Sequence, residues 1–129
     1  MEVPAPVAAW HAIAASRDPA GLADLLADDV VFRSPAVHAP QPGKELTTAY
    51  LSAAVVVLGP TLAYRRQWYG ETNAVLEFEA TLDGLDVHGI DLFQWDEHGR
   101  IVEFTVMVRP FKGLQKLIEL MAAELFPAG

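Results

Sequence analysis

Asp91 is the side chain best suited to do chemistry in this sequence. It lies in Gly89-Ile90-Asp91-Leu92-Phe93, a run typical of a β-strand. The strand period of two places Asp91 on one face and its neighbours Ile90 and Leu92 on the other. Apolar surroundings would raise the pKa of the carboxyl and suit it to act as an acid or hydrogen-bond donor. The structural alternative is an aspartate bonded to a neighbouring donor inside the fold.

His38 is the candidate general base. It lies in a proline-rich loop, and imidazole titrates near neutral pH, so it could take a proton at the mouth of a pocket. A solvated loop histidine is the alternative. The other histidines are poorer candidates. The strand period places His88 on the face opposite Asp91, His98 lies in a turn, and His11 is expected at the surface.

No residues have the spacing of a metal site. Glu77 and Glu79 indicate one polar strand face, so neither a metal nor a cofactor is expected.

In the segment 61–70, Tyr64 and Arg66 share one face, and the opposite face also mixes aromatic with cationic residues. The sequence therefore does not decide which of the two faces points inward. Facing inward, Tyr64 and Arg66 could bind an anionic or carbonyl oxygen; otherwise they form an aromatic wall or a dimer face. Arg109 is expected to be a salt-bridge or interface anchor.

Periodicity and chain breakers predict the elements that position these residues. Helical spacing indicates a helix that ends before Asp18-Pro19, a second that ends at Asp28-Asp29, a third over 44–58 and a fourth over 113–126. Residues 30–32 are strand-like, and 35–43 form a loop. Strands over 61–70, 74–82, 85–95 and 100–109, joined by tight turns, predict an antiparallel meander. This order predicts a single α+β domain over 1–129, with helices against one concave sheet face.

Composition limits the classes of partner. The chain has 129 residues, 52% hydrophobic residues and a formal charge of −8, the wrong sign for nucleic acid or an anionic membrane. It has no cysteine, which excludes disulfides, thiolate metal sites and a cysteine nucleophile. The N-terminus lacks the basic region of a signal peptide, and no apolar run is long enough for a membrane span, so a cytoplasmic location is expected.

Several motifs in this order resemble those of one superfamily. They are the stretch from Leu25 to Phe32, the Ser34-Pro35 loop that closes at Gly43, and the strand 89–93 leading to 96–101. Over nearly the whole chain up to Arg109 they resemble the NTF2-like superfamily, with its SnoaL-like and ketosteroid-isomerase-like domains. The resemblance implies a cone of N-terminal helices packed on a curved antiparallel sheet around a blind pocket, with an extra C-terminal helix. Members include isomerases, cyclases, dehydratases, epoxide hydrolases and plain binding modules.

The resemblance also implies roles residue by residue. Asp91 aligns with the aspartate that steroid-isomerase members keep protonated to donate to an oxyanion. Ser34 stands where those members have an aspartate base, and Trp10 stands where they have an oxyanion tyrosine. Gly89 occupies the place of an arginine in the epoxide-hydrolase members. Tyr50 aligns with an aromatic residue of the pocket wall.

These observations predict a pocket for a small hydrophobic, carbonyl-bearing molecule. The first hypothesis is a cofactor-free isomerase, cyclase or lyase that acts by proton transfer through Asp91 and His38. The alternatives are a non-catalytic binding or dimerisation module, which the serine at Ser34 supports, and a protein-interaction subunit that uses the outer sheet face. A homodimer is expected, because apolar residues such as Met107 occupy that outer face. The predicted pocket residues are Trp10, Ser34, Tyr50, Tyr64, Phe78, Phe93, Phe104 and Val106, with Leu76, Ala80 and Val108 on the same face.

Overall fold

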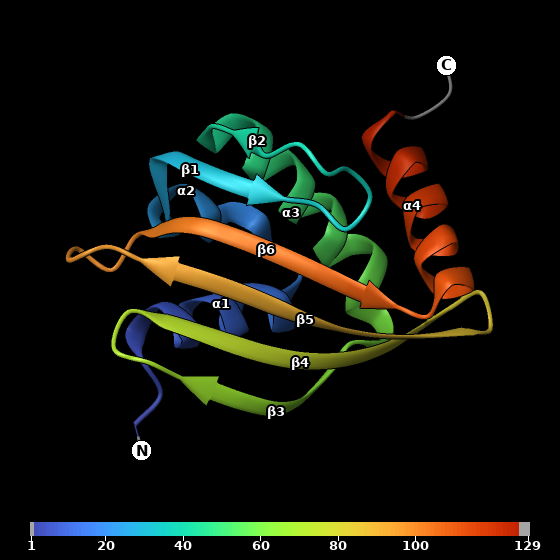
Figure 1. Cartoon of the computed structure of the whole chain (residues 1–129), viewed down its shortest axis with the longest axis horizontal. Coiled ribbons are helices and arrows are strands. Elements are labelled where there is room, and N and C mark those ends of the chain that lie inside the picture. The colour runs from blue at the N-terminus through green and yellow to red at the C-terminus, as the bar shows by residue number, and fades with distance from the viewer. Residues whose placement is uncertain (1, 127–129) are drawn as a thin grey trace.

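A six-stranded sheet forms one side of the molecule (Figure 1). The structure is a computed structural model and describes residues 2–126. The strand order is β2-β1-β6-β5-β4-β3, and all neighbours are antiparallel except β1 and β6. The strands are β1 (Leu26–Arg33), β2 (Gln41–Pro42), β3 (Ala63–Tyr69), β4 (Asn73–Leu82), β5 (Leu85–Trp95) and β6 (Ile101–Arg109).

The parallel pair is a departure from the predicted antiparallel sheet. The predicted meander is present as β3 to β6, whereas β1, which precedes α3 in the chain, pairs with β6 in the same direction. Alternation within a strand says which face is buried but not which edge a distant strand joins. The fold class is nevertheless the expected α+β cone with a C-terminal helix.

The helices lie mainly on one face of the sheet. Figure 1 shows α1, α2 and α3 behind the strands, and α4 standing beside α3 where β6 ends. The helices are α1 (Ala5–Ser16), η1 (Pro19–Gly21), α2 (Leu22–Leu25), α3 (Lys44–Leu58), η2 (Gly59–Thr61) and α4 (Phe111–Leu125). The layer they form closes the inner sheet face from water.

The second helix is shorter than predicted. Asp18 caps η1 by accepting a hydrogen bond from the Ala20 N–H at 3.0 Å, as its position before Pro19 suggested. Helical geometry then ends at Leu25, and the strand begins at Leu26, which is fully buried and pairs with Ile101. A register shift before Val31 accommodates Asp28 and Asp29, the two exposed residues at which the helix was predicted to end.

The core lies between the helices and the inner sheet face. Alternate residues of β4, of β5 and of β6 from Phe104 onward face the core as predicted, while Glu103 and Arg109 do not. Glu77 is also buried, at 7% exposed, but it lies on the opposite sheet face against Arg66 and His88. A register shift between β5 and β6 brings Ile101 into the core as well. Phe78, Phe93 and Phe104 are each at most 1% exposed. Asp91 is the one carboxyl that shares this inner face within residues 2–126.

A bulge in β3 explains why its inward face could not be predicted. The register of β3 against β4 shifts between Tyr64 and Gln67. Tyr64 therefore turns inward against Phe78, whereas Arg65 and Arg66 are both exposed. Alternate residues therefore do not stay on one face along this strand, because the bulge adds one residue to β3 between Tyr64 and Gln67.

Within residues 2–126, the helices are all too short or too polar to cross a bilayer.

Candidate functional site

A buried chain of hydrogen bonds joins α1, β3 and β5. The Trp10 Nε1–H donates to Tyr64 Oη at 2.8 Å, and the Tyr64 hydroxyl donates to Asp91 Oδ2 at 2.6 Å. The 2.6 Å separation is at the short end for O–H···O bonds and is typical of a charged acceptor. The bulge in β3 brings Tyr64 into reach of Asp91 across β4. The three residues form a polar network in a largely apolar interior.

The surroundings of Asp91 change its titration. Burial raises the pKa of the Asp91 carboxyl from its ordinary 3.8 to about 7, although the hydrogen bonds from Tyr64 and Trp10 act in the opposite direction. Burial and the neighbouring carboxylate also raise the pKa of Tyr64 well above its ordinary value. The raised pKa of Asp91 is the direction that its apolar sequence neighbours predicted. Near neutral pH, Asp91 can therefore either hold or accept a proton.

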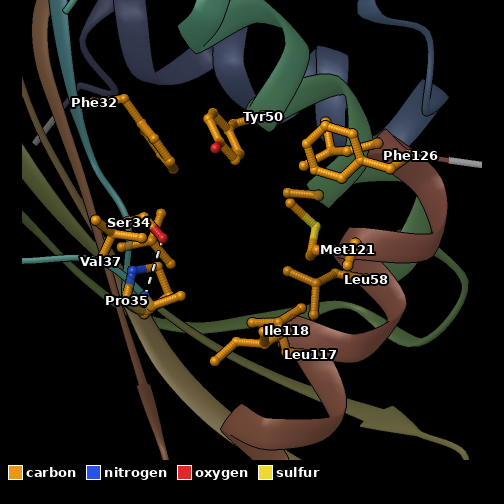
Figure 2. Close-up of a pocket in the computed structure, with 15 residues that line it drawn as sticks. Phe32, Ser34, Pro35, Val37, Tyr50, Leu58, Leu117, Ile118, Met121 and Phe126 are labelled. Carbon is orange, nitrogen blue, oxygen red and sulfur yellow. Dashed lines mark hydrogen bonds between the residues drawn. The ribbon is translucent and has the colours of Figure 1, made fainter. Parts of the chain in front are cut away.

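A cavity of about 180 Å³ lies beyond the end of this network. Figure 2 shows its walls: the loop after β1 with Ser34 on one side, α4 on the other, and Tyr50 from α3. Ser34 and Tyr50 supply the polar side chains of the lining, and the rest of the described wall is apolar. The lining residues are Phe32, Ser34, Pro35, Ala36, Val37, Tyr50, Ala54, Leu58, Val106, Leu117, Ile118, Met121, Ala122, Leu125 and Phe126.

The cavity and the Asp91 network are neighbours but separate. Val106 lines the cavity and is paired across the sheet with Asp91, which itself is 5% exposed and is not part of the lining. Beside them, Phe104 packs edge-on against Trp10 at 5.0 Å and stacks on Phe93 at 5.2 Å. This aromatic packing fills the interior that a wider cone would leave open.

Apart from His38, the predicted catalytic and pocket residues fall into three groups. Ser34, Tyr50 and Val106 line the cavity. Trp10, Tyr64 and Asp91 form the buried network. Phe78, Phe93 and Phe104 do not line this cavity, because their rings pack into the core. Leu76 and Ala80 are buried in the same core, and Val108 packs against it.

His38 lies apart from both the cavity and Asp91. It is exposed on the loop between β1 and β2, and it does not line the cavity, although the preceding Ala36 and Val37 do. In this arrangement the imidazole faces solvent.

The residues of α4 are the part of the site that the sequence reasoning missed. Leu117, Ile118, Met121 and Leu125 form one wall of the cavity, and Phe126 lies at its edge (Figure 2). The amphipathic spacing of this segment was visible in the sequence, but the same spacing also describes a helix packed on a closed core. Only the position of α4 beside α3 distinguishes the two cases.

A second polar cluster lies on the outer sheet face. The Arg66 Nε and Nη2 groups each donate to Glu77 at 2.8 Å, and His88 Nε2 lies 2.8 Å from the same carboxylate. These partners hold the pKa of Glu77 far below its usual range. Arg109 contacts His88 through its Nη1 group. Among residues 2–126, no group of three or more His, Asp or Glu side chains is arranged to hold a metal ion.

Comparisons with known proteins agree with this architecture. The sequence model of the SnoaL-like domain family matches residues 7–104. A crystal structure described as a steroid delta-isomerase from Pseudomonas aeruginosa is 42% identical, with a TM-score of 0.89 over 94% of this chain and 89% of that one. A protein with a cystatin-like fold from Silicibacter pomeroyi is 30% identical, with a TM-score of 0.85 over 92% and 84% of the two chains.

A more distant structure shows the fold alone. An NTF2-like protein of unknown function from Mesorhizobium loti is 22% identical, with a TM-score of 0.73 over 81% of this chain and 88% of that one. No curated protein matches the sequence. The match over most of the chain, the helices on a curved sheet and the 42% identical structure lead to one conclusion. This chain belongs to the SnoaL-like domain family.

Proposed function

We propose that this chain binds a small, uncharged hydrophobic molecule in the cavity between β1, α3 and α4. The observation that carries the proposal is the composition of the wall, where Ser34 and Tyr50 are the polar side chains in a lining that otherwise consists of apolar residues. Apolar cavities of this kind favour ligands that remove the same apolar surface from water.

The size of the cavity limits the ligand. At about 180 Å³ it is slightly larger than an apolar cavity of about 150 Å³ that holds benzene, and it is smaller than the roughly 300 Å³ at which pockets for drug-sized molecules begin. One ring or two fused rings fit these dimensions. A four-ring steroid would have to extend out of the cavity.

Filling the cavity tests this proposal. Ala122 lines the cavity on α4, whereas its neighbour Ala123 does not, and both residues are exposed. Indane, a two-ring hydrocarbon, serves as the probe, and its affinity is measured from NMR chemical-shift changes. Ala122→Phe should abolish binding while Ala123→Phe leaves it unchanged, because only the first ring occupies the cavity. Equal indane affinity in both variants, or no binding to the wild-type chain, would contradict the proposal.

Isomerase-type catalysis at Asp91 is the second candidate function. Two observations favour it: burial places the pKa of Asp91 at about 7, and a 42% identical structure is described as a steroid delta-isomerase. In this role Asp91 would donate its proton to a carbonyl oxygen of the substrate, with no cofactor. The candidate base, His38, faces solvent in this structure, so its loop would have to move toward the substrate. The hydroxyl of Ser34 is no base at neutral pH. Asp91 lies behind Val106, so a substrate would have to reach past the cavity wall to contact it.

Conversion of a cyclic β,γ-unsaturated ketone to its conjugated isomer tests the second candidate. The conjugated product absorbs in the ultraviolet, so the rate is read directly. If Asp91 catalyses the reaction, the rate is proportional to the protein concentration, and it falls at least about a hundredfold in the Asp91→Asn variant relative to wild type. His38→Ala tests the base separately. The same rate in wild type and Asp91→Asn would remove Asp91 from the mechanism and leave ligand binding as the function.

A further inference from the structure

The first half of α4 is anchored to the sheet. Gly113 is buried so close to β5 that a Cβ atom at this position would lie 2.6 Å from Cγ1 of Val87. One turn further along the helix, Leu117 is 4% exposed and belongs to the core. Both contacts would have to break before residues 111–117 could move away from the sheet.

The second half of α4 has no comparable anchor. Each of residues 118–125 is half-buried or exposed, and none is buried. Leu120 and Met121 pack against the core but keep part of their surface in solvent. Ile118, Met121 and Leu125 line the cavity, so they face empty space where a helix on a closed core would meet other side chains (Figure 2). The missing contacts make this half the less stable part of the helix.

The end of α4 is also weakly capped. The last turn contains the carboxylate of Glu124 and no basic side chain, whereas the negative end of the helix dipole favours cations. The residue that follows the helix is Phe126, and it does not adopt the left-handed conformation that ends many helices. We therefore expect α4 to open from its C-terminal end, as far as the anchored Leu117.

We propose that residues 118–125 form a gate, which opens by local unfolding to admit a ligand to the cavity and refolds over it. The gate rests on the proposed binding function and describes how exchange at that site is controlled. Figure 2 shows Met121 across the cavity from Pro35 and Val37, so unwinding of the gate widens the space between the helix and this loop. A ligand in the cavity contacts the apolar side chains of the gate and thereby stabilises its helical form.

Two matched glycine substitutions test the gate. Ala123 lies in the gate and Gln115 in the anchored half, and both residues are exposed and outside the cavity lining. Glycine weakens a helix at either position, and for Ala123→Gly the loss corresponds to about a fivefold increase in the opening equilibrium. Gln115→Gly does not favour opening of the gate, because residue 115 is helical in both the closed and the open form.

The exchange rates of indane provide the readout, measured from NMR line shapes across a titration. Ala123→Gly should raise the association and dissociation rates about fivefold each and leave Kd within about twofold of wild type, because the open state stays a minor population. Gln115→Gly should change neither rate by more than about twofold. Glu124→Lys should slow both rates about threefold, since a cation stabilises this end of the helix, and the change of charge does not affect an uncharged hydrocarbon directly.

The outcomes separate the gate from the binding function beneath it. If indane binds the wild-type chain but both glycine variants change its rates equally, or Ala123→Gly changes Kd without accelerating association, the gate is wrong and the binding function stands. If indane does not bind the wild-type chain, the binding function fails and the gate fails with it. Glu124→Lys strengthens the helix, so its result does not depend on a variant that folds poorly.

Discussion

Raising the pH should destabilise this protein through Asp91. Burial gives the folded-state carboxyl a pKa of about 7, against 3.8 for the exposed group. Between these values the folded state holds a proton that the unfolded chain has released. The stabilisation is therefore complete below about pH 4 and is lost as the pH rises through 7.

The magnitude follows from the difference between the two pKa values. One pKa unit corresponds to about 1.4 kcal/mol, so a difference of roughly three units corresponds to about 4 kcal/mol in the free energy of unfolding. About 3 kcal/mol of this should be lost between about pH 5 and pH 8. The two carboxyls with lowered pKa values, Glu77 and Asp96, act below about pH 4.5 and in the opposite direction, since their stabilisation is lost on acidification.

Urea unfolding of wild type and Asp91→Asn at a series of pH values measures the effect. The amide keeps an oxygen that accepts from Tyr64 but does not titrate, so subtracting the variant cancels every other ionisable group. The buried indole of Trp10 provides a fluorescence signal for unfolding. The stability of wild type relative to the variant should fall by about 3 kcal/mol from pH 5 to pH 8. A difference that stays constant within about 0.5 kcal/mol would refute burial as the determinant of this titration.

Three further predictions concern other parts of the fold. Tyr64→Phe removes the acceptor of the Trp10 N–H and the donor to Asp91, so it should lower the free energy of unfolding in urea by about 2–4 kcal/mol. The same variant should raise the pKa of Asp91 further in a carbon-13 NMR titration, and an unchanged pKa would count against the hydrogen bond. Gly89→Ala should cost about 1–3 kcal/mol in thermal unfolding because its Cβ would meet the Met107 carbonyl and lie 2.7 Å from Phe78, whereas Gly21→Ala, at 3.4 Å from Ile13, serves as the mild control. We also expect a homodimer through the outer sheet face, where Trp68 and Met107 are about half exposed, and Met107→Lys should convert it to a monomer in light scattering; a monomeric wild type at micromolar concentration would contradict this.

Local patterns were enough to predict much of the fold. Alternation along 74–82 and 101–109 gave the buried face, because a one-residue slip would have turned Glu77 and Glu103 into the core. Asp18-Pro19 marked the start of a helix, and the apolar neighbours of Asp91 indicated the direction of its pKa. Each of these features depends on residues close together in the chain.

The tertiary structure decided how these parts form a site. The bulge in β3 turns Tyr64 toward Asp91, and this contact joins residues 27 positions apart. The packing of Phe93 and Phe104 fills the middle of the cone, while the docking of α4 beside α3 leaves a cavity at its end. An amphipathic helix buries its apolar face equally well on a closed core or over an open space. The sequence by itself thus determined which faces are apolar, and only the packing of distant elements determined where they leave room for a ligand.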